Sequence, residues 1–166
     1  MKALGIAFIL LSAFSVGSRI SVGLKQQCRY LQCVIDALQI FENEIAVRCT
    51  PLPEAFSVMA TAAQGSAQTI FLHVSDQMQQ QRWTSPRSAM ENALKSISEN
   101  LIGDILLDLS DKLGKYDIDT QLAEIAYAKE RVKRRLYDLE SERKMKSKTY
   151  KTLSLCTGLA VVILLI

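Results

Sequence analysis

The sequence predicts an all-α protein, an antiparallel helical bundle whose first and last long helices continue into membrane segments at the two ends of the chain. Three observations support this prediction. Apolar residues recur every three or four positions through the middle of the chain, both ends are rich in apolar residues, and Asn-Gly and Asp-Gly hairpin turns are absent. A length of 166 residues allows one domain, and a hydrophobic fraction of 49% excludes a disordered chain.

The first apolar segment lies between Lys2 and Arg19 and contains sixteen uncharged residues. At 1.5 Å per residue it spans about 24 Å, and Arg19 can extend its charge to the membrane boundary. We therefore predict a transmembrane segment over residues 1–24. The alternative is a cleaved signal peptide with its cleavage site at residues 16–18. The helical pattern continues past residue 18 without a turn signal, which favours the membrane helix.

Residues 25–151 are predicted to form one helical bundle domain. The first helix carries an apolar stripe and should end near Cys49, because Thr50 precedes a proline. We expect Thr50 to cap the second helix and Pro51 to occupy its first position, with Leu52 inside it. The stripe of the first helix consists of Cys28, Leu31, Ile35, Leu38, Glu42 and Ile45.

Four short helices should follow the first corner, and the second helix of the chain should end near Gly65. Ser85-Pro86 repeats the combination of a cap and a proline, and Gly114 ends a helix over residues 101–113. The predicted inward residues are Leu52, Ala55, Phe56 and Met59 in the second helix, Ile70, Phe71, Val74 and Met78 in the third, and Met90, Ala93, Leu94 and Ile97 in the fourth.

The last helix should begin after a cap at Asp117 or Asp119, because neither Gly nor Pro follows until Gly158. Its apolar stripe, from Ile118 to Leu139, can pack along the first long helix. Residues 152–166 are predicted to be a second transmembrane segment, although their apolar length is marginal for spanning a bilayer. The alternative is a buried core helix.

The basic residues cluster before the second membrane segment, and residues 129–166 carry 10 Lys or Arg against 4 Asp or Glu. Because basic flanks stay on the cytoplasmic side, the domain between the segments should be cytoplasmic. Acidic residues interrupt the basic stretch, and its charge increases towards the apolar tail, so anionic lipid headgroups are favoured over nucleic acid as its partner. The membrane-surface cluster is Arg143, Lys144, Lys146, Lys148 and Lys151.

Residues that could perform catalysis are sparse. The glycines do not form a phosphate-binding loop, and the four cysteines and His73 lack the spacing of a metal site. His73 and Asp76 could form a pair, but no nucleophile motif accompanies them. We therefore predict no catalytic site, no cofactor and no metal, and we interpret the protein as non-enzymatic.

Glu42 and Glu44 are the polar residues most in need of an explanation. Glu42 falls on the apolar stripe of the first helix, where an isolated carboxylate would cost several kcal/mol unless it were paired. One interpretation is a structural ion pair with a residue of the last helix, such as Lys129 or Arg135. The other is a contact surface for a partner protein.

Five sequence pieces occur in an order that resembles a known family. They are Ala37-Leu38, Phe41-Glu42-x-Glu44-Ile45, Thr50-Pro51-Leu52, Leu113-Gly114-x-x-Asp117-x-x-x-Gln121, and Gly158 in the terminal apolar helix. With the membrane segment that precedes them, they closely resemble the stage III sporulation protein AB family of endospore-forming bacteria. The resemblance covers nearly the whole chain.

The resemblance implies a domain of about six helices, similar to the F-protein domain of type II secretion and type IV pilus machines. It also implies a membrane platform in the channel between mother cell and forespore, on the mother-cell side. A cytoplasmic ATPase similar to stage III sporulation protein AA, and other membrane proteins of the channel, would be its partners. A homo-oligomer is left open.

By the same resemblance, two groups of positions match the family pattern. We interpret Thr50, Pro51, Leu52, Gly114 and Asp117 as a structural motif, and Glu42, Glu44 and Gln121 as candidate partner contacts or buried polar positions. Two other functions compete with the platform. A membrane-anchored helical adaptor would share its topology but bind a soluble ligand, and a secreted helical protein would lose its leader.

Overall fold

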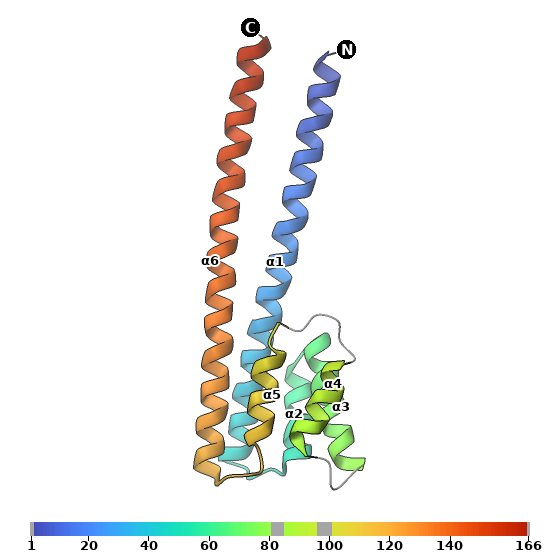
Figure 1. The fold of residues 1–166 in the computed structure, drawn as a ribbon, viewed down its shortest axis with the longest axis vertical. Helices are drawn as coiled ribbons and strands as arrows, with labels where there is room; N and C mark the ends of the chain where they lie inside the picture. Colours follow the sequence, from blue (N-terminus) through green and yellow to red (C-terminus); the bar gives the residue numbers. More distant parts are fainter. Residues whose placement is uncertain (1, 81–84, 96–100, 166) are drawn as a thin grey trace. The chain divides into compact units, whose positions relative to one another are not determined.

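The computed structural model describes residues 2–80, 85–95 and 101–165, and describes side chains within residues 23–145 of these ranges. These residues form six helices and no strand, which confirms the predicted all-α class (Figure 1). The helices are α1 Lys2–Ala46, α2 Leu52–Ala62, α3 Ser66–Gln80, α4 Pro86–Lys95, α5 Gly103–Lys112 and α6 Ile118–Leu165.

The chain divides into two compact units. The first unit combines the start of α1, up to Arg29, with the end of α6, from Tyr137. The predicted membrane segments 1–24 and 152–166 belong to this unit, and nearly all their side chains lie outside the described residues. In the described part of the chain, no helix has the length and apolar character needed to cross a bilayer.

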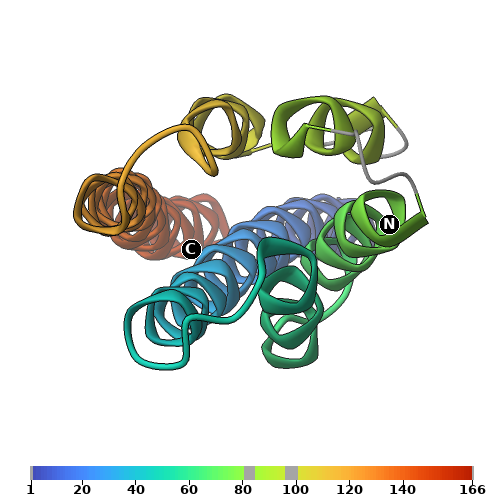
Figure 2. The ribbon, with the colours of Figure 1, turned by 90° about the horizontal axis from the view of Figure 1, so that it is seen from below.

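The second unit, Tyr30–Leu136, is a bundle whose helices follow one another around its core in chain order (Figure 2). α6 returns beside α1, so the first and last helices are neighbours within this unit. Its buried aromatic side chains come from α1, α2 and α3, whereas α6 contributes three buried aliphatic ones among the described residues. The members from α6 are Ile125, Ala128 and Val132.

The apolar stripes predicted from the sequence form most of this core. Leu31, Leu38 and Ile45 of α1 are buried, and the Phe41 ring lies 4.8 Å from the Phe56 ring of α2, measured between centroids. Burying a large apolar side chain stabilises a fold by about 1.5–3 kcal/mol, so these residues hold the bundle together. The inward residues predicted for α3 and α4 are buried as well, except that Met78 is half-buried and Ile97 lies outside the described residues.

The helix boundaries confirm some predicted caps and correct others. The Ser85 Oγ atom accepts a hydrogen bond of 3.2 Å from the Ser88 amide, as a capping residue for α4 should. α1 ends at Ala46, before the predicted end near Cys49. Ile118 was expected in the apolar seam but is 50% exposed, because it lies at the first residue of α6, beyond the covering helices.

Candidate functional site

The predicted motif residues gather at one end of the second unit, where α1 meets α2 and α5 meets α6. We call this end, residues 43–54 and 111–121, the corner end (Figure 1). α1 reaches it and α6 leaves it, so within this unit the chain enters and exits at the opposite end. The corner end is therefore built from two separate connections of the chain.

Glu44 is the centre of the first connection. Its side chain is buried, and its two carboxylate oxygens accept hydrogen bonds of 2.8 Å from Arg48 Nη1 and Thr50 Oγ1. The Thr50 amide also donates to the Glu44 carbonyl oxygen at 3.1 Å. Cys49, between these partners, has a φ of 50°, in the left-handed region that non-glycine residues adopt rarely. Glu44 thus holds the chain in its reversal from α1 to α2.

These bonds correct the predicted role of Thr50. We expected Thr50 to cap α2 with Pro51 at the first helical position, but Pro51 occupies the capping position and the helix begins at Leu52. The Thr50 hydroxyl donates instead to the preceding helix, to the carboxylate of Glu44 in α1. A buried carboxylate needs hydrogen-bond donors more than an exposed helix end does, because water can satisfy the helix end.

Asp117 and Gln121 organise the second connection. Asp117 caps α6, since its carboxylate accepts bonds from the Thr120 amide at 3.2 Å and the Thr120 hydroxyl at 2.7 Å. The hydroxyl bond is the main reason why the pKa of Asp117 is lowered. Gln121 accepts from the Gly114 amide at 3.2 Å and donates to the Tyr116 carbonyl at 2.7 Å. Both ends of its amide are therefore engaged in the turn.

The two connections meet at Gly114 and Leu52. Gly114 has a φ of 76°, and a Cβ atom added there would lie 3.3 Å from Leu52 Cδ1. Glycine therefore suits the end of α5 for two reasons. It adopts a left-handed backbone without strain, and it has no Cβ atom to crowd Leu52. Leu52 and Gly114, far apart in the sequence, thus share one contact.

Glu42 makes the ion pair that the sequence suggested as one interpretation. Lys129 Nζ of α6 lies 2.5 Å from Glu42 Oε2 and 2.8 Å from Gln39 Oε1. The side chains of Glu42 and Lys129 are mostly covered, and Gln39 also donates to Glu42 at 3.1 Å. This network joins α1 to α6 inside the second unit. Arg135, the other suggested partner of Glu42, pairs with Asp104 instead.

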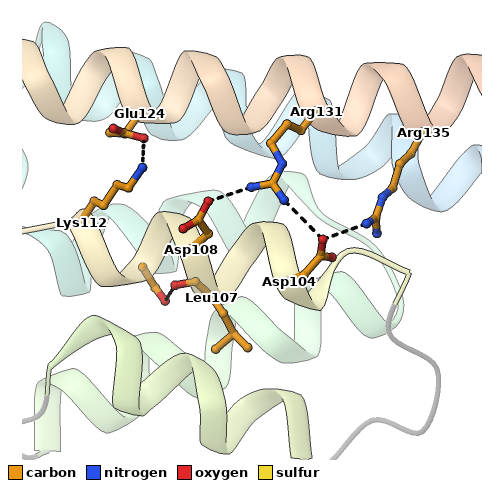
Figure 3. Close-up of polar contacts among 8 residues, drawn as sticks. Asp104, Leu107, Asp108, Lys112, Glu124, Arg131 and Arg135 are labelled. Atoms are coloured by element: carbon orange, nitrogen blue, oxygen red, sulfur yellow. Dashed lines mark hydrogen bonds and ion pairs between the residues drawn. The ribbon is translucent and has the colours of Figure 1, made fainter.

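A series of ion pairs joins α5 to α6 and was not predicted (Figure 3). Lys112 pairs with Glu124 at 2.7 Å, Asp108 with Arg131 at 2.8 Å, and Asp104 with Arg135 at 2.8 Å and with Arg131 at 3.3 Å. We call these six residues the charge ladder. Arg135 also donates to the Leu101 carbonyl oxygen. The sequence signal for the charge ladder was the spacing of four residues between charges on the predicted helices.

Three exposed large apolar side chains lie at the corner end, whereas the others among the described residues lie on α3 and along α6. Val47 is 79% exposed, Tyr116 55% and Ile118 50%. Beside them, Arg48 offers a largely exposed positive charge and Lys115 a second one. Their exposure was not predicted, and Ile118 was expected in the apolar seam, because exposure here depends on where the two connections meet.

The structure gives no support for a metal or redox centre in the parts of the chain that it describes. Among these residues, no three His, Cys, Asp or Glu side chains lie close enough to hold a metal ion. Cys28, Cys33 and Cys49 are free thiols, and His73 is exposed on α3. Of the membrane-surface cluster, Arg143 is half-buried and Lys144 exposed, while Lys146, Lys148 and Lys151 lie outside the described side chains.

The fold defines an all-helical bundle protein, and three of its exposed apolar side chains lie at the corner end. The model of the family "stage III sporulation protein AB" matches residues 2–166. Stage III sporulation protein AB of Bacillus subtilis (strain 168) is 26% identical over 170 residues, which cover 99% of each chain. A solved structure of stage III sporulation protein AB (SpoIIIAB) is also 26% identical, with a TM-score of 0.62, and the match covers 70% of this chain and 94% of that chain.

The chain therefore belongs to the stage III sporulation protein AB family, as its motifs suggested.

Proposed function

We propose that the chain is a non-enzymatic membrane platform of a secretion-like channel needed for endospore formation, and that it couples to or anchors a cytoplasmic ATPase. The observation that carries this proposal is the family match over residues 2–166, supported by a sporulation relative that covers 99% of the chain. The all-helical bundle suits a protein that binds and positions others.

The membrane part of the proposal rests on the sequence. The two apolar ends flank a domain whose neighbouring basic residues favour a cytoplasmic location, on the mother-cell side during sporulation. The basic cluster from Arg143 to Lys151 would bind anionic lipid headgroups, because each Lys or Arg near such a surface contributes about 1 kcal/mol. Both ends of the chain would then cross the membrane.

We assign the protein contact to the corner end, and specifically to Val47, Tyr116 and Ile118. Glu42, Glu44 and Gln121, the contact candidates from the sequence, bond within the chain. Large apolar side chains gain free energy when a partner removes them from water, and aromatic residues are common at the centre of interfaces. Arg48 and Lys115 would form part of a polar rim.

Co-purification with the ATPase tests this function. The full-length chain, extracted in detergent, should retain a stage III sporulation protein AA-like ATPase, and a variant with Val47→Ser, Tyr116→Ser and Ile118→Ser should lose most of it. The matched control is Leu72→Ser, which removes an apolar side chain that is 41% exposed on α3. Circular dichroism should show equal helix content in all three proteins.

The outcomes separate the parts of the proposal. If the unaltered chain retains no ATPase, the coupling function is wrong. If the triple variant retains as much ATPase as the unaltered chain, the contact lies elsewhere on the bundle. Charge reversal at Glu42 or Glu44 would be a poorer test, because both carboxylates have partners within the fold.

A further inference from the structure

The charge ladder has a sign pattern that changes along each helix. On α5 the residue nearest the corner end is positive, Lys112, and the next two are negative, Asp108 and Asp104 (Figure 3). On α6 the order is opposite, with Glu124 nearest the corner end and Arg131 and Arg135 beyond it. The two patterns are therefore complementary at the observed axial position of α6 beside α5.

The apolar contacts of α6 specify this position less well. Its buried residues Ile125, Ala128 and Val132 lie on a stripe that continues to Leu122 on one side and Leu136 on the other. A shift of α6 by one turn, about 5.4 Å, would bring other apolar residues of the stripe to nearly the same places. Apolar attraction has no direction, so it discriminates poorly between such positions.

A one-turn shift in either direction would break the ladder. Relative to α5, a shift of α6 towards the corner end would place Ala128 opposite Lys112 and Leu139 at the Leu101 carbonyl, while Arg135 would take the place of Arg131 opposite Asp108. A shift the other way would place Thr120 opposite Lys112 and Tyr127 opposite Asp108, while Arg131 would take the place of Arg135 opposite Asp104. Either shift keeps one Arg–Asp pair but leaves Lys112 and other charged groups without partners, so the ion pairs disfavour the neighbouring registers.

We propose that the charge ladder is a register lock, which fixes the axial position of α5 along α6 to within one helical turn. On its other side, α6 is held against α1 by Lys129 and Glu42, so a shift of α5 along the α1–α6 pair leaves that contact intact. One-turn shifts between packed helices are a known form of conformational change, and this lock governs whether α5 can make one. The inference does not depend on the proposed ATPase.

Zero-length carbodiimide cross-linking followed by mass spectrometry tests the lock, since the reagent joins only an amine and a carboxylate in contact. The full-length chain in detergent should yield the Lys112–Glu124 link, at 2.7 Å, and the Glu42–Lys129 link, at 2.5 Å. Arg131→Glu places a carboxylate against Asp104 and Asp108. It should lower the Lys112–Glu124 yield about fivefold while the Glu42–Lys129 yield and the helix content stay unchanged.

Two further variants make the test specific. Arg134→Glu carries the same charge change on the same helix, but Arg134 is 77% exposed and its ion pair is with Glu130 of α6 itself, so both links should persist. Asp108→Arg combined with Arg131→Glu restores one opposite-charge pair and should recover the Lys112–Glu124 link.

The lock is overturned if Arg131→Glu leaves the Lys112–Glu124 yield unchanged, or if Arg134→Glu lowers it equally. It is also overturned if Arg131→Glu abolishes both links, which would mean that α6 has left the bundle, or if the double variant recovers nothing.

Discussion

Gly114 and Gly65 are two glycines with left-handed φ angles, 76° and 61°, but their surroundings differ. A Cβ atom at Gly114 would lie 3.3 Å from Leu52 Cδ1, whereas a Cβ at Gly65 would have nothing within 4 Å. Gly65→Ala should therefore destabilise the fold by about 1 kcal/mol through the backbone alone, and Gly114→Ala by about 2 kcal/mol. Urea unfolding followed by circular dichroism measures both. Equal losses would show that the Leu52 contact does not constrain Gly114.

Glu44 and Arg48 are partners in one ion pair but differ in exposure. The Glu44 side chain is 8% exposed and that of Arg48 is 71% exposed. Glu44→Ala leaves the Thr50 hydroxyl without its acceptor and creates a cavity inside the first connection. We therefore expect a loss of about 1–3 kcal/mol in the free energy of unfolding. Arg48→Ala should cost less than about 1 kcal/mol, because the exposed partner can be replaced by water. A larger loss for Arg48→Ala in the same urea assay would contradict this assignment.

For single residues, the sequence predicted which positions are important better than it predicted their roles. Asp117 caps α6 as predicted, because its side chain bonds a backbone group three residues away and such local geometry is repeated in most proteins. Thr50 was misassigned because its partner, Glu44, lies in the preceding helix, and the bond exists only after the chain has reversed. A buried polar position was one of the two roles predicted for Glu44, but its partners Arg48 and Thr50 were not predicted.

At the element scale, α6 depends on polar contacts more than the other long helix does. Lys129 joins it to Glu42 and Gln39 of α1, and the Lys129 side chain is only 15% exposed. Lys129→Ala should destabilise the second unit by about 1–2 kcal/mol, since it leaves a mostly covered carboxylate without its cation.

Lys133→Ala is the matched control for this prediction, because Lys133 lies one turn further along α6 and is exposed. It should change the free energy of unfolding by less than about 0.5 kcal/mol. Chemical denaturation with a probe of helix content compares the two variants. If both change stability by the same amount, the Glu42–Lys129 pair contributes no more than a surface charge.

Helix positions were predictable because apolar periodicity, prolines and capping residues act within a few neighbours. The start of α4 at Pro86 and the end of α5 before Gly114 follow from such local signals. The charge ladder could not be predicted as a set, since it depends on which helix lies beside α6 and in which register. The spacing of its charges showed only that each helix has a charged face.

At the scale of the whole molecule, the proposed topology can be tested through Cys49, an exposed thiol at the corner end. If the bundle is cytoplasmic, a membrane-impermeant maleimide should not label Cys49 in intact cells and should label it after permeabilisation. Cys49→Ser is the control, because it identifies any signal from the remaining cysteines. Labelling of Cys49 in intact cells would place the corner end outside and contradict the proposed orientation.

The all-helical class, the family and most helix boundaries could be predicted from the sequence, because they depend on periodicity and on signals between near neighbours. Which side chains serve the fold and which face solvent became clear from the packed helices. Glu42, Glu44 and Gln121 became internal partners, while Val47, Tyr116 and Ile118 stayed exposed. Burial and ion pairing at the corner end require two connections some seventy residues apart to meet. The spacing of nearby residues in the sequence does not specify such contacts between distant segments.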